Sequence, residues 1–335
     1  MHVMIIGGAG MVGAKLARAL AEAGRIGGDR IDRMTLVDVV TPQIEAREGI
    51  EIALREADLS DPKVAECLVS LRPDVIYHLA AIVSGEAESD FDKGYRINLD
   101  GTRHLFDMIR QAHDADGYCP RVIFTSSIAI FGTPFPDSIP DEYFRTPLTS
   151  YGTQKAISEL LLEDYTRRGF FDGLALRLPT ICIRPGRPNL AASGFFSNIL
   201  REPLAGKEAV LPVPDSVRHW HSSPRTVVRN LVMAGGMDFG ALGHRRSITL
   251  PGLSATVAEQ IEALREVAGD AAVGLIRQEP DETIARIVGG WPERFEATRG
   301  RELGFIADRS FREIIEVHLE DELGTTIEAY RAAQG

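Results

Sequence analysis

Short apolar runs alternate with longer helical patterns through the first half of the 335-residue chain. The runs predict six strands, at residues 2–8, 33–39, 50–59, 73–81, 121–127 and 173–181. Helical patterns lie among them at residues 10–24, 95–114 and 150–169. Strands that alternate with helices of this length form parallel β-α-β units, in a sheet that helices cover on both faces. The alternation therefore predicts an α/β protein with a doubly wound parallel sheet.

The pattern loosens after about residue 180, where prolines cluster between Pro179 and Pro224. We expect helices there at residues 193–206, 256–269 and 310–324, and short strands at 208–213 and 246–252. This half predicts a smaller mixed domain over residues 179–335, after a first domain over residues 1–178, with some segments returning to the first domain. We expect the second domain at the carboxyl ends of the strands, where such sheets bind ligands.

Glycines at positions 7, 10 and 13 follow the first expected strand and open the first helix. Gly7 can form the tight turn, Gly10 lets the backbone approach a pyrophosphate, and Gly13 lets the helix pack closely on the strand. The helix then presents the N–H groups of Met11 and Val12 to the phosphates. A glycine pattern alone is weak evidence, but its place between a strand and a helix is typical of a Rossmann-type dinucleotide site.

An acidic residue, Asp38, ends the second expected strand. Its carboxylate can accept hydrogen bonds from the adenosine ribose and would repel a 2′-phosphate, which favours NAD over NADP. The glycine loop contains no basic residue, which agrees with NAD. Asp58 and Leu59, at the end of the third strand, are placed to meet the adenine. The stretch at the end of the fourth strand is small enough to let the dinucleotide backbone lie close: Leu79, Ala80 and Ala81.

Tyr151 and Lys155 lie four residues apart in an expected helix, so they share one helix face. Tyrosine has a pKa of about 10, which is too high for an efficient base near neutral pH. A nearby ammonium stabilises the phenolate and lowers that pKa. The pair predicts a proton-transfer site that also needs a hydroxyl to hold the substrate oxygen. Spacing alone does not choose among the three hydroxyls at the end of the fifth strand: Thr125, Ser126 and Ser127.

The charge balance limits the possible partners. The formal net charge is −11 and the isoelectric point is about 5.3, whereas a general nucleic-acid binder needs a basic surface. The window from Arg184 to Arg225 is locally basic, which indicates either a small anionic ligand or a solvated patch. No apolar run reaches the ~20 residues that span a bilayer, and the first residues lack a signal-peptide pattern. Three scattered cysteines fit a reducing compartment, so we expect a cytoplasmic protein without membrane or nucleic-acid partners.

The glycine loop, Asp38, "HLAA", "FTSS" and the Tyr151–Lys155 pair together resemble the extended short-chain dehydrogenase/reductase family, over essentially the whole chain. The resemblance implies an NAD-dependent enzyme with Tyr151 as the general base or acid and Lys155 as its partner. It also implies that Asn98 is the helix asparagine that supports the site.

In that family the catalytic hydroxyl lies five residues before the glycine of a Tyr-Gly pair. The corresponding glycine is Gly132, so the resemblance implies Ser127 as the catalytic hydroxyl. The tyrosine of the family pair is Phe131 here, a mild departure. Related proteins contact the nicotinamide after the sixth strand, which implies contacts from Pro179 and Thr180. Family members commonly dimerise through a four-helix bundle, which implies a homodimer through helices 95–113 and 151–168.

The second half, on "LRLPTICIRPGRPN" and "VRHWHSSPR", resembles a subgroup first labelled as nucleotide-sugar epimerases. That subgroup includes enzymes that oxidise the C2 hydroxyl of a four-carbon sugar acid to a 2-oxo acid, and we expect this activity. The alternative is a nucleotide-sugar 4-epimerase or dehydratase that uses tightly bound NAD. A non-catalytic binding protein is a further alternative, but such members usually lose the tyrosine or the lysine, and both are present here.

A sugar acid needs a cation for its carboxylate, and arginine suits that geometry. The candidates in the basic window are Arg184, Arg187 and Arg225. A substrate hydroxyl could be held by Ser84, Asn189 or His221. The diphosphate of a nucleotide sugar would also attract arginines, so the basic window does not discriminate between the two substrates. His219 and His221 could form a metal pair, but no carboxylate or cysteine lies nearby in the sequence and the mechanism needs no metal, so we expect none.

Overall fold

The computed structural model describes residues 1–186 and 192–334, and the chain forms two compact units. The first unit comprises Met1–Ile130, Pro147–Leu178 and Val228–Thr249. The second unit comprises Phe131–Thr146, Pro179–Val227 and Leu250–Gly335. Across the described ranges, no helix combines the length and the apolar character that a membrane span requires.

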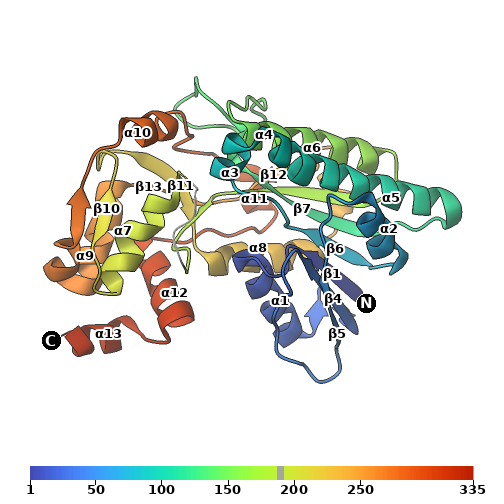
Figure 1. Ribbon diagram of the computed structural model, residues 1–335, viewed down its shortest axis with the longest axis horizontal. Coiled ribbons are helices and arrows are strands. Elements are labelled where there is room, and N and C mark those ends of the chain that lie inside the picture. Colours follow the sequence, from blue (N-terminus) through green and yellow to red (C-terminus); the bar gives the residue numbers. More distant parts are fainter. Residues whose placement is uncertain (187–191, 335) are drawn as a thin grey trace. The chain divides into compact units, whose positions relative to one another are not determined.

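A seven-stranded sheet is the centre of the first unit, with the strand order β12-β8-β7-β6-β1-β4-β5 (Figure 1). The strands are β1 (His2–Ile6), β4 (Arg33–Asp38), β5 (Glu51–Glu56), β6 (Val75–His78), β7 (Arg121–Ser127), β8 (Asp172–Leu178) and β12 (Ser247–Thr249). All neighbouring strands pair in parallel, as the alternating pattern predicts. The strand order reverses beside β1, which marks the point where doubly wound sheets bind ligands.

All six strands expected from the first half of the sequence are present in this sheet. The seventh strand, β12, falls in the expected strand at residues 246–252. It pairs with β8, so it belongs to the first unit although it lies late in the chain. Its partner could not be predicted because three residues carry no pairing signal of their own.

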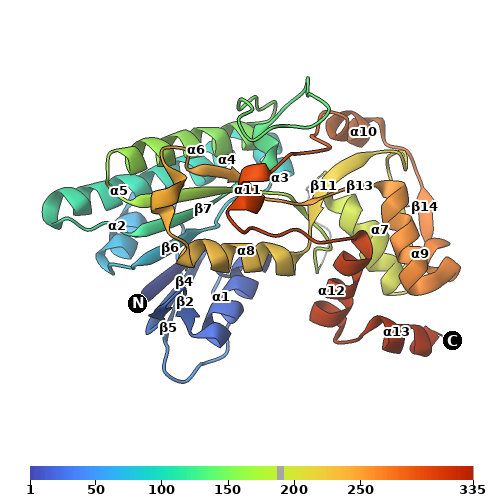
Figure 2. The ribbon, with the colours of Figure 1, turned by 180° about the vertical axis from the view of Figure 1, so that it is seen from behind.

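Helices cover both faces of the sheet (Figures 1 and 2). One face is covered by α2 (Pro62–Ser70), α5 (Gly101–Asp116) and α6 (Ser150–Arg167). Buried rings of Phe106, Phe124 and Phe171 fill the core on that side. The other face is covered by α1 (Met11–Ala23) and by the Val228–Gly236 part of α8 (Pro224–Gly236). A Cβ added at Gly235 would overlap the Tyr77 hydroxyl, so α8 approaches the sheet closely there.

Several elements that lie wholly or partly in the first unit were not expected from the sequence. They are the hairpin of β2 (Arg25–Ile26) and β3 (Asp29–Arg30), the helices α2, α3 (Ser84–Ser89), α4 (Phe91–Gly94) and α8, and the 3-10 turns η2 (Ile128–Ile130) and η3 (Phe239–Leu242). The expected helix at 95–114 is divided: it begins as a π-helix, η1 (Tyr95–Asp100), and continues as α5. Single π-turns of this kind are frequently found at functional sites.

The second unit contains two small sheets and most of the C-terminal helices (Figure 2). Its strands are β9 (Thr180–Ile181), β10 (Ala209–Leu211), β11 (Arg218–Ser222), β13 (Leu253–Thr256) and β14 (Ile276–Gln278). Its helices are α7 (Gly194–Leu204), α9 (Val257–Val273), α10 (Glu282–Val288), α11 (Thr298–Glu302), α12 (Phe311–Leu323) and α13 (Ile327–Gln334). The sheet of β13, β11 and β9 is mixed, because β11 pairs antiparallel with β13 and parallel with β9. The helices expected at 193–206, 256–269 and 310–324 are present as α7, α9 and α12.

Candidate active site

The glycine loop follows β1 and is tightly packed. Gly7 has a φ of 94°, and a Cβ added to it would lie 2.7 Å from the Ala80 backbone nitrogen. A Cβ at Gly13 would overlap the Gly7 carbonyl oxygen. Because Gly10 precedes α1 without a side-chain cap, the first N–H groups of the helix, including those of Met11 and Val12, receive no capping side chain. The loop therefore fits a pyrophosphate, which needs a close backbone approach and N–H donors.

Asp38 lies at the end of β4, beside the glycine loop. Its Oδ2 accepts a hydrogen bond from the Ala9 N–H at 2.9 Å, and its Oδ1 accepts one from the Val39 N–H at 2.7 Å. These bonds fix the carboxylate next to the start of the pyrophosphate loop. The position fits the adenosine ribose of NAD and disfavours a 2′-phosphate.

The other residues expected to contact the dinucleotide lie on neighbouring strand ends. Asp58 Oδ1 accepts a hydrogen bond from the Ser60 N–H at 2.9 Å, and Arg96 lies 3.5 Å from Oδ2. Burial raises the pKa of the Asp58 carboxyl, but the hydrogen bonds from Ser60 and the Arg96 charge outweigh it and lower that pKa overall. Leu59 is buried. After β6, Leu79, Ala80 and Ala81 are partly exposed, and the backbone of Leu79 and Ala80 lies against Gly7.

Tyr151 lies in the first turn of α6, and the chain around it packs closely. The Thr149 hydroxyl caps the helix by accepting a hydrogen bond from the Gly152 N–H at 3.1 Å. A Cβ at Gly152 would overlap the Ala129 carbonyl oxygen. The Ala129 N–H in turn donates to Ser127 Oγ at 3.1 Å. The small residue beside Tyr151 therefore lets the start of α6 lie against the segment that carries Ser127.

Lys155 lies one turn beyond Tyr151 and is 2% exposed. Its ammonium donates to the Thr125 carbonyl oxygen at 2.8 Å and lies 4.6 Å from the centre of the Phe124 ring and 5.7 Å from the Tyr151 ring. Burial lowers the pKa of Lys155 to about 7, against a raising effect of the Glu159 carboxylate. The ammonium is therefore beside the phenol ring, where a positive charge stabilises a phenolate.

The three hydroxyls at the end of β7 differ in their surroundings. Thr125 is buried and donates to the His78 carbonyl oxygen at 3.3 Å. Ser126 is buried, and its Oγ has no hydrogen-bond partner within residues 1–186 and 192–334. Ser127 alone of the three is partly exposed. Exposure therefore favours Ser127 as the hydroxyl that can reach a substrate.

Asn98 lies in the π-helix η1 and is buried. Its Oδ1 accepts a hydrogen bond from the Ile82 N–H at 2.8 Å, and its Nδ2 donates to Gln154 Oε1 at 2.8 Å. Asn98 therefore ties the segment after β6 to the helix that carries Tyr151 and Lys155. These two bonds leave Asn98 placed where it can support the segment that carries Tyr151 and Lys155.

The remaining cofactor candidates and the arginines are residues of the second unit, whereas Ser84 is the partly exposed first residue of α3 in the first unit. Pro179 precedes β9, and the Thr180 hydroxyl pairs with His219 Nε2 at 2.7 Å. The Arg184 guanidinium donates to the Ile181 carbonyl at 3.1 Å and to Ser193 Oγ at 2.9 Å.

Three further sequence candidates are Arg225, Arg187 and Asn189. Arg225 forms ion pairs with two carboxylates of α12, Glu320 at 2.8 Å and Asp321. These ion pairs make it a poorer candidate than Arg184 for binding a substrate carboxylate. Arg187 and Asn189 lie outside the described residues.

His219 and His221 are buried on β11, and burial lowers the pKa of His219 to about 3 and the pKa of His221 well below its usual value. His219 Nδ1 lies 3.1 Å from the Pro292 carbonyl oxygen, and His221 Nε2 lies 3.2 Å from Gln260 Nε2. These contacts, with stacking of His219 on Phe196, give both rings packing roles. No group of three or more potential metal ligands occurs in the part of the chain that the structure describes.

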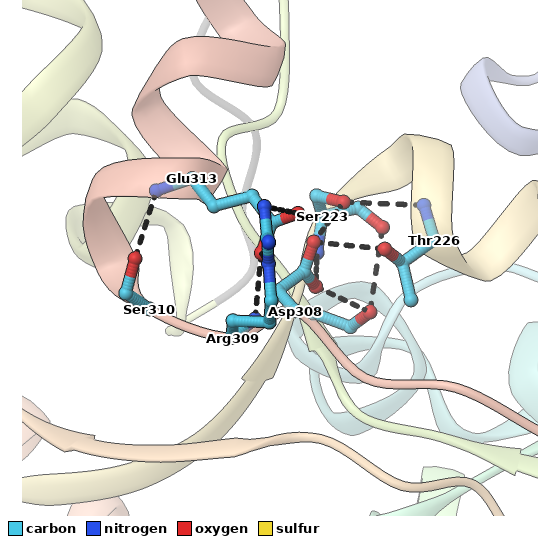
Figure 3. Close-up of polar contacts among 7 residues, drawn as sticks. Ser223, Thr226, Asp308, Arg309, Ser310 and Glu313 are labelled. Atoms are coloured by element: carbon cyan, nitrogen blue, oxygen red, sulfur yellow. Dashed lines mark hydrogen bonds and ion pairs between the residues drawn. The ribbon is translucent and has the colours of Figure 1, made fainter.

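The start of α8 is fixed by a buried carboxylate, that of Asp308 (Figure 3). Its oxygens accept hydrogen bonds from Ser222 Oγ at 3.1 Å, Ser223 N at 2.7 Å, Ser223 Oγ at 2.6 Å and Thr226 Oγ1 at 2.8 Å. Ser223 Oγ also caps α8 by accepting from the Thr226 N–H at 3.1 Å. The serine pair of "HSSPR" therefore anchors a segment of the second unit that is distant in the sequence.

Sequence reasoning missed one charged pair beside the site, Glu159 and Arg177. Glu159 follows Lys155 by four residues on α6, so the spacing Tyr-x-x-x-Lys-x-x-x-Glu placed it on the same helix face. The signal was present, but nothing in the sequence paired it with an arginine of β8.

Comparison with known proteins gives one family and near-full-length relatives. Residues 3–225 match the model of the NAD dependent epimerase/dehydratase family. The chain is 46% identical over 325 residues to D-erythronate dehydrogenase of Cupriavidus necator, covering 96% of this chain and 98% of that protein. It is 43% identical to D-erythronate dehydrogenase of Haemophilus influenzae, covering 96% of this chain and 100% of that protein. The crystal structure of the nucleoside-diphosphate-sugar epimerase from Agrobacterium tumefaciens is 65% identical and superposes with a TM-score of 0.95, covering 98% of this chain and 96% of that one.

Proposed function

This chain belongs to the NAD-dependent epimerase/dehydratase family, and we propose that it oxidises the C2 hydroxyl of a small sugar acid of the D-erythronate class to the 2-oxo acid. It is an NAD-dependent dehydrogenase of the extended short-chain dehydrogenase/reductase type. The observation that carries the proposed chemistry is the buried Lys155 ammonium beside the Tyr151 ring, at the end of the strand that supplies Ser127.

Each proposed role follows from the position of the side chain. The Tyr151 phenolate removes the proton of the substrate hydroxyl, and Lys155 stabilises that phenolate by its charge. The Ser127 hydroxyl holds the substrate oxygen while the carbon–oxygen double bond forms. Bound NAD⁺ supplies the acceptor for the hydride that leaves C2. The acid therefore leaves with two electrons and two hydrogens fewer, as a 2-oxo acid.

We propose that the cofactor is held by the glycine loop and Asp38, with Asn98 supporting the site. The support is the close packing of Gly7 and Gly13 and the uncapped start of α1. We propose that Asp58 and Leu59 contact the adenine and that Pro179 and Thr180 contact the nicotinamide. The backbone of the dinucleotide would lie along Leu79, Ala80 and Ala81.

For the substrate, we propose that an arginine of the second unit binds the carboxylate. Arg184 and Arg187 are the candidates, since Arg225 is already paired with two carboxylates. Ser84, partly exposed in the first unit, is proposed to bind a substrate hydroxyl.

The test is an oxidation assay with purified protein. NAD⁺ is supplied with D-erythronate, D-threonate and other small sugar acids, and the absorbance of NADH is followed. Formation of NADH together with a 2-oxo acid, trapped with a carbonyl reagent and identified by mass, is expected for D-erythronate. Absence of NADH with every acid, combined with interconversion of a UDP- or dTDP-sugar, would overturn the proposal.

A nucleotide-sugar 4-epimerase or dehydratase is the second candidate, favoured by the name given to the Agrobacterium tumefaciens protein. Such an enzyme returns the hydride to its substrate within one turnover, so NAD stays bound and no NADH accumulates. Analysis of the denatured protein for bound NAD, with a chromatographic assay on UDP-sugars, separates the two candidates.

We also propose a homodimer, formed through helices 95–113 and 151–168, in the cytoplasm. The exposed side chain of Leu160 on α6 supports such a contact. All three cysteines are free thiols, and Cys67 and Cys119 are exposed, which fits a reducing compartment. Light scattering at a range of concentrations tests the dimer.

A further inference from the structure

Glu159 and Arg177 form a buried ion pair in the first unit. Glu159 is fully buried, and Arg177 is 4% exposed. The guanidinium contacts the carboxylate in a two-pronged arrangement, with Arg177 Nε 3.0 Å from Glu159 Oε1 and one terminal nitrogen 2.9 Å from Oε2. Such a pair is oriented firmly because both partners are planar.

The pair lies in the layer between the sheet and α6. On β8, Arg177 is flanked by Ser126 of β7 and Thr249 of β12 in the strand register, and it lies 3.4 Å from the Thr249 hydroxyl. Glu159 reaches this layer from α6. The polar layer therefore continues from the Lys155 ammonium toward the edge of the sheet.

A buried ion pair is a weak source of stability, because desolvation of both charges offsets their attraction, and well-packed apolar residues often stabilise a fold as well or better. The burial of these two charges therefore calls for another reason. Their position offers one, since Tyr151, Lys155 and Glu159 follow each other at intervals of four on one face of α6.

Within the described residues, three elements supply the charged and titratable groups that are linked to Lys155 directly or through Glu159. They are Tyr151 and Glu159 on α6, Arg177 on β8 and His78 on β6. His78 is neutral near pH 7, because burial and the Lys155 charge lower its pKa to about 3. Burial lowers the pKa of Lys155, and the Glu159 carboxylate raises it. Arg177 faces the Glu159 carboxylate and fixes where that negative charge lies.

We propose that the Glu159–Arg177 pair is a positioning element of the active site, in which Arg177 orients the Glu159 carboxylate and Glu159 holds Lys155 in its charged form. The inference rests on the proposed roles of Tyr151 and Lys155. It concerns neither hydride transfer nor substrate choice, and neither Glu159 nor Arg177 touches the reacting atoms.

The physical consequence concerns where one proton lies. In the active form of the site, Tyr151 has lost its proton and Lys155 has kept its own. In a competing form of equal total charge, the proton is on the phenol and the lysine is neutral. A negative charge next to Lys155 favours the active form. With the proton affinity of the Tyr151 phenolate unchanged, each unit by which the Lys155 pKa falls lowers the proportion of the active form about tenfold relative to the competing one.

The variant Glu159→Gln removes the negative charge but leaves the buried Arg177 charge without this carboxylate, so the variant risks not folding. The double variant Glu159→Gln with Arg177→Met removes both charges and keeps similar volumes. Glu163→Gln is the matched control, since Glu163 lies one turn farther along α6 and accepts a hydrogen bond from Ser247 at 2.7 Å. Circular dichroism and NAD⁺ affinity establish that each variant is folded.

The first readout is the titration of Lys155 itself. The chain has only five lysines, at positions 15, 63, 93, 155 and 207, so ¹³C labelling at Cε gives a simple spectrum. In NAD⁺-saturated protein, the Lys155 signal is identified by its loss in Lys155→Met. We expect its midpoint at lower pH in Glu159→Gln, at an intermediate pH in the double variant, and unchanged in Glu163→Gln.

The second readout is the pH dependence of kcat with the sugar acid. At neutral pH we expect kcat to fall about tenfold for each unit by which the Lys155 midpoint falls, with a smaller change in KM. A Lys155 midpoint equal to wild type in the double variant overturns the proposal, whatever Glu159→Gln does. If no sugar acid is oxidised by the wild-type protein, the proposed function fails, and the NMR titration still decides the role of the pair.

Discussion

Lys155 is expected to destabilise the fold that it serves, and the substitution Lys155→Met tests this. Burial lowers the pKa of Lys155 from 10.5 to about 7. At about 1.36 kcal/mol for each pKa unit, this is an unfavourable contribution of roughly 4–5 kcal/mol at pH 7, as an upper estimate. Methionine removes it but also takes the buried Lys155 donor away from the Thr125 carbonyl, which costs about 1–3 kcal/mol. A net gain of roughly 1–4 kcal/mol is expected.

The pH dependence has a definite sign. Because the folded pKa lies below the unfolded one, the unfolded state binds more protons between about pH 7 and about pH 10.5. The stability of the wild-type protein therefore rises with pH across this window, and the Lys155 contribution is fully unfavourable below it. The advantage of Lys155→Met should be largest at or below about pH 7 and shrink by up to about 1.4 kcal/mol per pH unit above it.

The assay is urea unfolding without cofactor, between about pH 6 and about pH 9, followed by circular dichroism and tryptophan fluorescence. Trp220 and Trp291 both belong to the second unit, so fluorescence gives an internal reference for a change made in the first unit. Lys93→Met is the control, because the Lys93 side chain is partly exposed and its ammonium is paired with Glu86. A stability difference for Lys155→Met that is flat with pH, or of the opposite sign at pH 7, would refute the reasoning.

Three further outcomes follow from the same contacts. Tyr151→Phe should lower kcat by about 10³-fold and leave the Kd for NAD⁺ nearly unchanged by calorimetry; retained activity would mean that another group is the base. Asp38→Ser should raise the kcat/KM ratio of NADP to NAD by about tenfold, whereas an unchanged ratio would remove Asp38 from the ribose site. Asp308→Ala removes the acceptor of four hydrogen bonds, so it should lower the unfolding free energy by about 3 kcal/mol in urea titrations. Asp270→Ala, at an 89% exposed carboxylate, is its control and should change little; equal effects would contradict the buried role of Asp308.

The sequence predicted the first six strands and the position of the glycine loop because both depend on local patterns. Apolar runs and the Gly7–Gly13 spacing are set within a few residues. It could not predict that β12 joins the sheet, because strand pairing between distant segments leaves no local trace. The π-turn at Tyr95–Asp100 was also missed, since the sequence pattern of these residues runs without a break into that of α5, which follows.

The candidate site shows the same division between local and distant contacts. Tyr151 and Lys155 lie on one helix, so their spacing carried the chemistry, whereas the family resemblance selected Ser127 among three neighbouring hydroxyls. The Asp308 contacts and the ion pairs of Arg225 join residues that are about 80 or more positions apart, and only the folded chain displays them. A basic patch in the sequence therefore did not distinguish an arginine held by α12 from one available to a substrate.

The residues proposed for proton transfer and those proposed for substrate binding belong to different units, so substitutions should affect the two properties separately. The residues proposed for proton transfer, and the Glu159–Arg177 pair beside them, all belong to the first unit, whereas the arginines proposed for the substrate carboxylate belong to the second. The charge on Lys155 depends on groups within its own layer of the first unit. Substitution of Arg184 should therefore raise KM for acids without moving the pH dependence of kcat. Glu159→Gln should instead move the pH dependence of kcat, with a smaller change in KM. If both substitutions changed the same parameter, proton transfer and substrate binding would not be separable in this chain.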